Sequence, residues 1–275
     1  YNYKKSYFNN ILKVLKTSFR LATDVFGFIR YNPAVTLRLP KIEDEVEFEK
    51  HLYNQDEINK ILERFKDDDV FTCAFITACY TGMRTGEVCS LTWDDIDFEN
   101  KEIHIRHSMQ TAYLNSKKIL NMTTPKTSNS IRDIPMFDGV EKLFVSWKEK
   151  QDKAKKELGR RWRLPKEFEN LVFTSSLGSP LTRYVLSNDI NKIVSILDKN
   201  EEYLAELENR KPQKFPKIHP HSFRHTFATR CFEKNLKPVF IMSIMGHSNY
   251  ETTLSYTHLL KKSNDQQVSL AGSFV

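Results

Sequence analysis

An apolar stripe at four-residue spacing runs through the segment HSFRHTFATRCFEK, where Phe223, Phe227 and Cys231 recur on one face of a helix. This spacing predicts a helix with one buried face. His221 and Arg224 are three residues apart in the segment, so such a helix presents both from the same side. A guanidinium grips a phosphate through two oxygens, and an imidazole adds N–H donors. The stripe therefore predicts a helix that carries two polar groups toward one ligand.

Three further signals lie outside this helix. Gly246 closes the apolar stretch PVFIMSIMG as a natural helix C-cap, and His247 follows it. Tyr256 lies a short distance downstream and offers a phenol as a nucleophile. Upstream, Arg84 follows Gly82, whose freedom lets the backbone turn closely and aim the guanidinium. Two arginines, histidines and a tyrosine in this order predict a site for phosphodiester transfer.

Three stretches together resemble one family. TGMRTGEVCSLTWDDID, HPHSFRHTFAT and MGHSNYETTLSYTH resemble the tyrosine recombinases of the phage-integrase type, which include the integrases of conjugative transposons. The resemblance covers the chain from about Tyr53 to Leu260, with a weaker echo in residues 1–40. It implies a mixed α/β, mainly α fold: a helical catalytic domain with a small antiparallel β-sheet, preceded by a partial helical core-binding domain. Together these domains are expected to clamp duplex DNA.

The resemblance also assigns roles to six residues, which are Tyr256, Arg84, Lys126, His221, Arg224 and His247. Tyr256 is expected to attack the scissile phosphate. The two arginines would neutralise charge on the non-bridging oxygens. His221 would accept the tyrosine proton or help hold the phosphate, His247 would hydrogen-bond the same oxygens, and Lys126 would protonate the leaving 5′-oxygen.

Competitors exist for several of these roles. Lys117 and Lys118 lie in the turn next to Lys126, which the surrounding Lys-Thr…Arg-Asp-Ile-Pro context favours as the acid. Tyr250 competes with Tyr256, but only Tyr256 lies in the context TTLSYTH. His225 is expected to be a structural histidine. Glu87, three residues beyond Arg84, is expected to be a supporting carboxylate that holds Arg84 in place; without the other motifs, the pair would be an ordinary surface ion pair.

Neither a metal nor a cofactor is expected. His219, His221 and His225 cluster in the sequence, but no Cys or carboxylate completes a set with zinc spacing. The four cysteines show no C-x-x-C spacing and are expected to be buried free thiols.

The charge balance favours a polyanionic partner. Lys and Arg number 42 against 35 Asp and Glu, which gives a net charge of +7 and a pI near 9.0. On charge alone, an ordinary basic soluble protein fits equally well. No apolar run approaches the roughly 20 residues that span a bilayer, and YNYKKSYFNN is no signal peptide, so a cytoplasmic protein is expected. The expected partners are double-stranded DNA at core recombination sites and further copies of the chain, from dimer to tetramer, with no membrane and no small-molecule substrate.

Four regions follow from the motifs and the resemblance. Residues 1–40 are expected to be the C-terminal part of a truncated core-binding domain, built on an amphipathic helix over residues 7–29 that ends before Asn32-Pro33. Residues 41–52 are expected to be a linker, residues 53–260 the catalytic domain, and residues 261–275 a tail that docks on a neighbouring subunit.

Within the catalytic region, Asn54 and Glu57 form a capping box ahead of a helix, and a second helix covers residues 70–80. A single small antiparallel sheet is expected from residues 102–106, 109–114, 118–122 and 130–135, with Asn115-Ser116 as a hairpin turn. Helices are expected over residues 140–158 and 184–199, and charged surface insertions over 150–169 and 199–217.

The expected function is site-specific recombination that integrates or excises a mobile element. Cleavage would pass through a 3′-phosphotyrosine, and strand exchange through a Holliday junction. A type IB topoisomerase uses the same set of residues to relax DNA, and chromosome-dimer resolution uses the same chemistry on another site. A DNA-binding protein with a silent site is disfavoured because every catalytic residue type is present.

Overall fold

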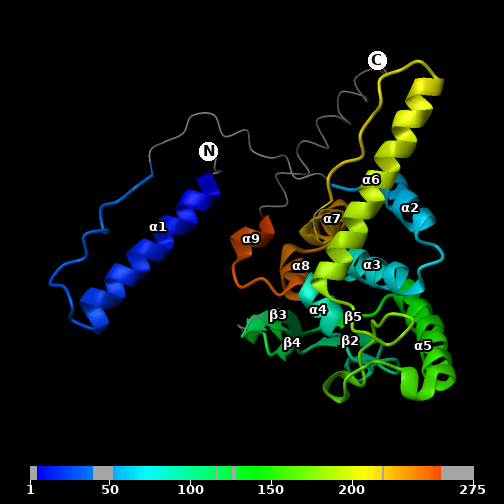
Figure 1. Cartoon of the computed structure of the whole chain (residues 1–275), viewed down its shortest axis with the longest axis horizontal. Coiled ribbons are helices and arrows are strands. Elements are labelled where there is room, and N and C mark those ends of the chain that lie inside the picture. The colour runs from blue at the N-terminus through cyan, green and yellow to red at the C-terminus, as the bar shows by residue number, and fades with distance from the viewer. Residues whose placement is uncertain (1–4, 40–51, 116, 126–127, 219, 255–275) are drawn as a thin grey trace. The chain divides into compact units, whose positions relative to one another are not determined.

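The computed structural model describes residues 5–39, 52–115, 117–125, 128–218 and 220–254. The chain divides into two compact units, Tyr1–Glu49 and Lys50–Val275 (Figure 1). Most of the expected linker and all of the expected tail, residues 261–275, lie outside the described residues. Among the described residues, no helix is long and apolar enough to cross a membrane.

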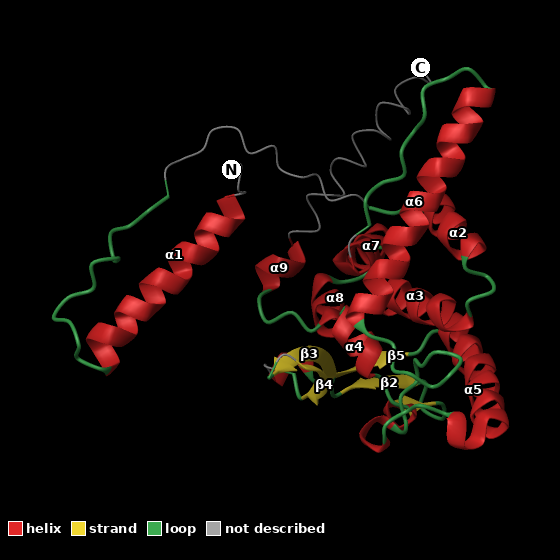
Figure 2. Ribbon diagram, in the orientation of Figure 1, coloured by secondary structure: helices red, strands yellow, loops and turns green. Residues whose placement is uncertain are grey.

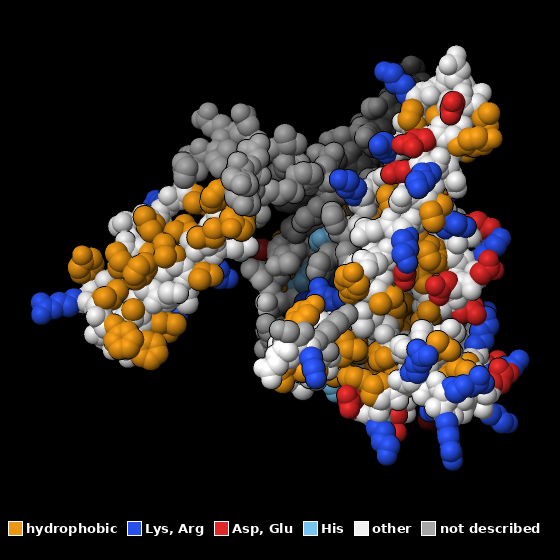
Figure 3. Space-filling model, viewed as in Figure 1, with side chains coloured by type: hydrophobic (Ala, Val, Ile, Leu, Met, Phe, Trp, Pro, Cys, Tyr) orange, Lys and Arg blue, Asp and Glu red, His pale blue; other side chains and the backbone are white. Residues whose placement is uncertain are grey.

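The first unit is built on helix α1, Lys5–Arg20, which continues as a π-helical turn, Leu21–Val25. The predicted helix is therefore right in kind but ends earlier than Ile29, because Gly27 takes a left-handed conformation with φ of +63°. The apolar stripe of α1 is not covered by other described residues of this unit, and Ile11 on this stripe is 48% exposed. Figure 3 shows hydrophobic side chains along this helix.

The second unit is mainly helical. Its helices are α2 Gln55–Arg64, α3 Asp69–Thr81, α4 Thr85–Ser90, α5 Asp138–Leu158, α6 Arg183–Leu207, α7 Pro220–Glu233, α8 Pro238–Met245 and α9 Tyr250–Leu254 (Figure 2). The predicted capping box begins α2: Asn54 accepts the Glu57 N–H, and the Glu57 carboxylate accepts the Asn54 N–H, each at 2.9 Å. These bonds satisfy donors that a helix start leaves unpaired.

The strands form two sheets rather than the single sheet predicted. β1 Ile96–Asp97, β2 Glu102–Ile105 and β5 Arg132–Pro135 make one antiparallel sheet in the order β1-β2-β5. β3 Ser108–Leu114 and β4 Lys117–Thr123 pair separately, with Leu114 opposite Lys117. β2 already has a partner on each edge, so β3 cannot pair with it. The predicted hairpin turn is confirmed, and Asn115 has the positive φ, 49°, that such a turn requires.

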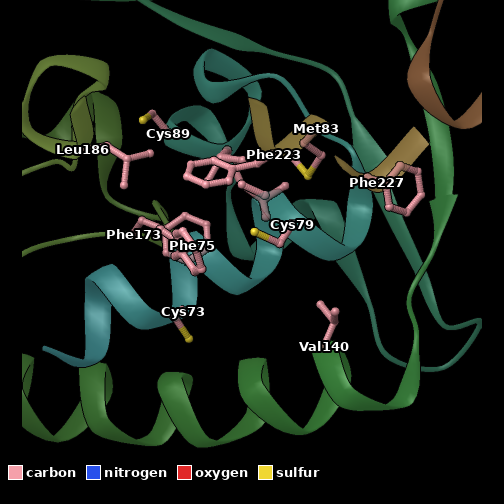
Figure 4. Packing of buried hydrophobic residues seen from close by; sticks show 14 of the residues in the cluster. Cys73, Phe75, Cys79, Met83, Cys89, Val140, Phe173, Leu186, Phe223 and Phe227 are labelled. Atoms are coloured by element: carbon pink, nitrogen blue, oxygen red, sulfur yellow. The ribbon is translucent and has the colours of Figure 1, made fainter. Parts of the chain in front are cut away.

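The hydrophobic core surrounds α3, which is buried along most of its length. Phe223 of α7 packs edge-on against Phe75 of α3, with ring centroids 4.7 Å apart. Phe223, Phe227 and Cys231 are all buried, which confirms the predicted stripe. Figure 4 shows Phe223 and Phe227 among the core residues. All four cysteines are buried and free, also as predicted. Burial raises the pKa of the Cys73 and Cys89 thiols to about 12, which keeps them protonated and inert.

The two predicted insertions are partly helical. Helix α5 is confirmed, and it includes the start of the stretch 150–169. Gln151 in this part of the helix is buried and donates to the carbonyls of Leu171 and Val172 at 3.1 and 2.9 Å. Helix α6 continues past residue 199 to Leu207, and Ala205 is fully buried near its end. Both stretches are mostly exposed, as predicted, and their few buried residues show that a helix can be charged on one side and packed on the other.

Candidate active site

Arg84 lies where two helices meet. Helix α3 ends at Gly82, whose φ of +66° is the left-handed C-cap conformation, and Arg84 is the residue that caps the start of α4. The Glu87 carboxylate accepts both the Arg84 backbone N–H and its Nη1, each at 2.8 Å. Arg84 Nη2 donates to the Gly246 carbonyl at 3.0 Å. These hydrogen bonds fix the direction of the Arg84 side chain, which is 35% exposed and therefore open to a ligand.

Arg224 comes from α7 and is almost completely buried, with 4% of its surface exposed. Its Nη1 donates to the Gly82 carbonyl at 2.7 Å, and its Nη2 donates to the Met245 carbonyl. Gly82 is the C-cap of α3, and Met245 is the last residue of α8, directly before its C-cap Gly246. Arg224 therefore ties the end of α3 to the end of α8.

His247 follows the left-handed C-cap Gly246, as predicted, and is 8% exposed. Its Nδ1 lies 2.9 Å from the hydroxyl of the fully buried Thr253. The pKa of His247 is lowered to about 4, mainly by burial and further by the positive charges of Arg224, Arg84 and Arg132, with a smaller contribution from His225. The imidazole is therefore neutral at pH 7.

The two arginines and His247 meet at one corner, the end of α8. Arg84 and Arg224 donate to the neighbouring carbonyls of Gly246 and Met245, and His247 is the next residue along the chain. A cleft of about 400 Å³ opens there. It is lined by Arg84, Glu87, Ser108, Gln110, Thr124, Pro125, Ser130, Gly246, His247, Ser248 and Thr252. The corner offers fixed positive charge and hydrogen-bond donors to an anion.

Glu87 is held between two guanidinium groups. Besides Arg84, Arg132 of β5 donates to it, with Nη2 to Oε2 at 2.8 Å and Nη1 to Oε1 at 3.1 Å. Burial by itself would raise the pKa of Glu87, but the hydrogen bonds and charges of Arg132 and Arg84 outweigh it and hold the pKa below its usual range. The carboxylate is therefore charged. It supports Arg84 as predicted, but it is not a surface residue.

Arg132 was not among the predicted site residues. Its Nε donates to the Ile244 carbonyl at 2.5 Å and its Nη1 to the Ser130 carbonyl at 3.0 Å, so it links β5, α8 and Glu87. A signal was present in the sequence: strand alternation places Arg132 on the same face as Ile134, which is fully buried. A buried arginine needs a carboxylate partner, and Glu87 is that partner.

The described structure does not include the side chains of three predicted site residues. His221 lies in α7 one turn before Arg224, but its side chain is outside the described structure. Lys126 and Tyr256 lie outside the described residues. Pro125, the residue before Lys126, and Thr252, four residues before Tyr256, both line the cleft. The competitors are placed: Lys117 in β4 and Tyr250 at the start of α9, where Tyr250 is 42% exposed.

One group in the described part of the chain has the donors and spacing of a metal site. Glu102, His104 and Asp133 offer ligand atoms within 4.8 Å of one another. They lie on β2 and β5, and the Asp133 carboxylate already interacts with His104 Nδ1 at 2.7 Å and Arg106 Nη2 at 2.5 Å. The group is not part of the cleft at His247.

Comparison with known proteins identifies the family. The model of the phage integrase family matches residues 52–263, more than half of the chain. The chain belongs to the phage integrase family. Among curated phage integrase relatives, it is 30% identical over 263 residues to a tyrosine recombinase XerC-like protein of Caldanaerobacter subterraneus, covering 92% of this chain and 62% of the relative. It is 28% identical to the transposase of transposon Tn916 from Enterococcus faecalis, covering 90% of this chain and 57% of that protein.

The fold agrees with this assignment. The integrase of transposon Tn1549, solved in complex with a circular intermediate DNA, superposes with a TM-score of 0.73 at 27% identity, covering 93% of this chain and 76% of that one. The predicted fold class, mixed α/β and mainly α, is therefore confirmed, although the antiparallel strands form two small sheets instead of one. The chain spans less than two thirds of the length of the two curated relatives described above.

Proposed function

We propose that this phage integrase family protein catalyses site-specific DNA recombination, integrating or excising a mobile element. The observation that carries the proposal is the convergence of Arg84, Arg224 and the neutral His247 at the end of α8. The only carboxylate in the cleft lining, among the described residues, is Glu87, and Arg132 and Arg84 offset its charge. A phosphodiester is the anion that suits such a corner. Relatives named as transposon integrases and transposases support the choice of substrate.

The proposed cleavage is a direct displacement at phosphorus. The Tyr256 phenol oxygen forms a bond to the scissile phosphorus while the bond to the 5′-oxygen breaks, and no phosphate is released. His221 accepts the phenol proton or helps hold the phosphate, and Lys126 gives a proton to the departing 5′-oxygen. Arg84, Arg224 and His247 stabilise the charge on the non-bridging oxygens. The products are a 3′-phosphotyrosine and a free 5′-hydroxyl.

Strand exchange is the reverse step on another duplex. A 5′-hydroxyl from the partner DNA attacks the phosphotyrosine and releases Tyr256, and two such rounds pass through a Holliday junction. The phosphotyrosine conserves the bond energy, so the chemistry needs no cofactor. Exchange between two duplexes requires several active sites, so we propose a homo-oligomer, from dimer to tetramer, on double-stranded DNA. The tail, residues 261–275, is proposed to dock on a neighbouring subunit, and the cytoplasm is the proposed place of action.

A second role is favoured by one relative. The XerC-like protein is 30% identical to this chain, and resolution of chromosome dimers would use the same chemistry on a chromosomal site. Cleavage of element-end duplexes in preference to chromosomal resolution sites would favour the mobile element. Relaxation of supercoiled DNA without any junction between two labelled duplexes would instead indicate a type IB topoisomerase.

The proposal is tested by trapping the covalent intermediate. A nicked element-end duplex loses its 5′-hydroxyl fragment after cleavage, so the protein–DNA adduct accumulates and is seen on a denaturing gel. Tyr256→Phe is expected to bind the duplex with unchanged affinity, because only one phenol oxygen is lost, and to form no adduct.

Tyr250→Phe is the matched control. Tyr250 is 42% exposed at the start of α9, six residues before Tyr256, and its variant is expected to form the adduct at the wild-type rate. Loss of the adduct in Tyr250→Phe, together with its survival in Tyr256→Phe, would move the nucleophile to Tyr250. Absence of any adduct with the wild-type chain on every duplex would refute the recombinase proposal.

A further inference from the structure

Thr253 is a buried polar residue directly beside the site. It lies in the short helix α9, none of its surface is exposed, and its hydroxyl oxygen is 2.9 Å from Nδ1 of His247. The two residues are six positions apart, so the contact closes the loop between α8 and α9. Thr252, its neighbour, faces the cleft instead. Thr253 thus contacts the back of the His247 ring.

The direction of this hydrogen bond follows from the surroundings of Thr253. Among the described residues, the Thr253 hydroxyl has no hydrogen-bond partner other than His247. If Nδ1–H were the donor, the hydroxyl hydrogen would be buried without an acceptor, which costs about 1–3 kcal/mol. If the hydroxyl is the donor, both atoms are satisfied. The geometry therefore favours a hydroxyl that donates to an unprotonated Nδ1.

This direction matters because the ring is neutral. A neutral imidazole carries one proton, and the nitrogen that holds it is the donor while the other is an acceptor. The charged and titratable groups that bear on His247 are the guanidinium groups of Arg224, Arg84 and Arg132, together with His225. All of them except the histidine are permanent cations, so a second proton on His247 is disfavoured. An acceptor nitrogen turned toward a phosphate oxygen would repel it.

We propose that Thr253 is a positioning residue that holds His247 in the tautomer with its proton on Nε2, so that the neutral ring donates a hydrogen bond to the scissile phosphate. The role of the Nε2 proton as a donor to the phosphate rests on the proposed recombinase function, but the tautomer of His247 does not depend on that function. Thr253 is also three residues before Tyr256 in the sequence. One hydroxyl therefore links the orientation of His247 to the segment that carries the proposed nucleophile.

The tautomer can be read directly by NMR of the whole chain labelled with ¹⁵N and ¹³C in histidine. The signals of His247 are assigned by their loss in His247→Gln. At pH 7 the wild type and Thr253→Ser, which keeps the hydroxyl, are expected to show the pattern of a ring protonated at Nε2. Thr253→Val, which removes the hydroxyl at nearly the same shape, is expected to shift the ring toward protonation at Nδ1. A wild-type ring protonated at Nδ1 would overturn the proposal without reference to any variant.

Cleavage of the nicked duplex provides the second readout. Thr253→Val is expected to cleave on the order of 10-fold more slowly, the rate equivalent of one hydrogen bond, with unchanged DNA affinity and with recovery in Thr253→Ser. Thr77→Val is the matched control, because Thr77 is equally buried and its hydroxyl donates to the Cys73 carbonyl at 2.8 Å within α3. Equal rates for Thr253→Val and Thr77→Val would also overturn the proposal. If the wild type formed no adduct, the NMR result would still decide the tautomer, so failure of the recombinase function and failure of this inference are distinguishable.

Discussion

Glu87 shows how a single buried carboxylate can organise the candidate active site. It accepts hydrogen bonds from Arg84 and Arg132, and both guanidinium groups also donate to carbonyls at the end of α8. Removing one member of such a network leaves buried charges without partners, which costs more than the pair contributes when it is intact. Loss of the Glu87 carboxylate is therefore expected to cost more free energy of unfolding than loss of a carboxylate from an exposed ion pair of the same length.

Glu87→Gln is expected to lower the free energy of unfolding by about 3 kcal/mol, because the buried Arg132 and the partly exposed Arg84 both lose their counter-charge. Denaturant-induced unfolding measures this change. Glu63→Gln is the control, since Glu63 also contacts a cation at 2.8 Å but is 72% exposed, and a change below about 1 kcal/mol is expected. Similar losses in the two variants would mean that the Glu87 network carries no special stability.

Residues with motif chemistry could be predicted from the sequence, and residues that support them could not. Arg84, Arg224 and His247 were predicted from the helix face of Arg224 and from the family motifs that contain all three, and the structure brings these three together. Arg132 and Thr253 were missed. Strand alternation could have indicated that Arg132 is buried, but not that its partner is Glu87, 45 residues away, and no local pattern indicates the contact of Thr253 with His247 across a loop.

At the scale of elements, the end of α3 fixes the position of Arg224. Gly82 has a φ of +66°, and a Cβ at this position would lie 2.4 Å from Cδ1 of the buried Phe227. The Gly82 carbonyl in turn accepts the hydrogen bond from Arg224. The close approach of α3 and α7 therefore requires a residue without a side chain.

Gly82→Ala is expected to destabilise the fold by about 2–4 kcal/mol, through left-handed backbone strain and overpacking against Phe227. Thermal unfolding and cleavage of the nicked duplex should both show a loss, since the Arg224 anchor moves. Gly139→Ala in α5 is the control: its added Cβ meets nothing within 4 Å, so a gain of about 0.5 kcal/mol is expected. An unchanged melting temperature in Gly82→Ala would contradict the packing argument.

Elements with strong local signals were predictable, and their pairing was not. The capping box at Asn54 and the glycine C-cap at Gly246 marked helix ends that the structure confirms. The strands were found, yet their division into two sheets depends on β2 pairing with β5 across about 30 residues. The length of α6 was also missed, because the burial of Ala205 is set by tertiary packing rather than by local charge.

At the scale of the whole molecule, the positive charge is unevenly distributed. Residues 1–39 contain seven Lys and Arg against one acidic residue, a net charge of +6 out of +7 for the chain. The remaining residues, with 35 basic and 34 acidic side chains, have a net charge of +1. Lys13, Lys16 and Arg20 follow the i, i+3, i+7 spacing and share one face of α1. An acidic run at residues 43–49 follows, so the whole first unit, residues 1–49, has 8 basic and 6 acidic residues and a net charge of +2. Attraction of this unit to DNA is therefore expected to come from the basic face of α1 rather than from the net charge of the unit.

Salt dependence of DNA binding tests this distribution. Each phosphate neutralised by a cation releases condensed counterions, so affinity falls as salt rises. Each such contact adds about 0.9 to the magnitude of the negative slope of log affinity against log salt. Replacing Lys13, Lys16 and Arg20 together by Gln is expected to reduce the slope by about 2–3 while leaving the active-site corner untouched. The control replaces Lys153, Lys155 and Lys156, exposed residues of α5, by Gln: it removes the same charge and is expected to change the slope by less than about 1. Equal slopes in the two triple variants would show that DNA responds only to net charge, and that the basic face of α1 is not a contact surface.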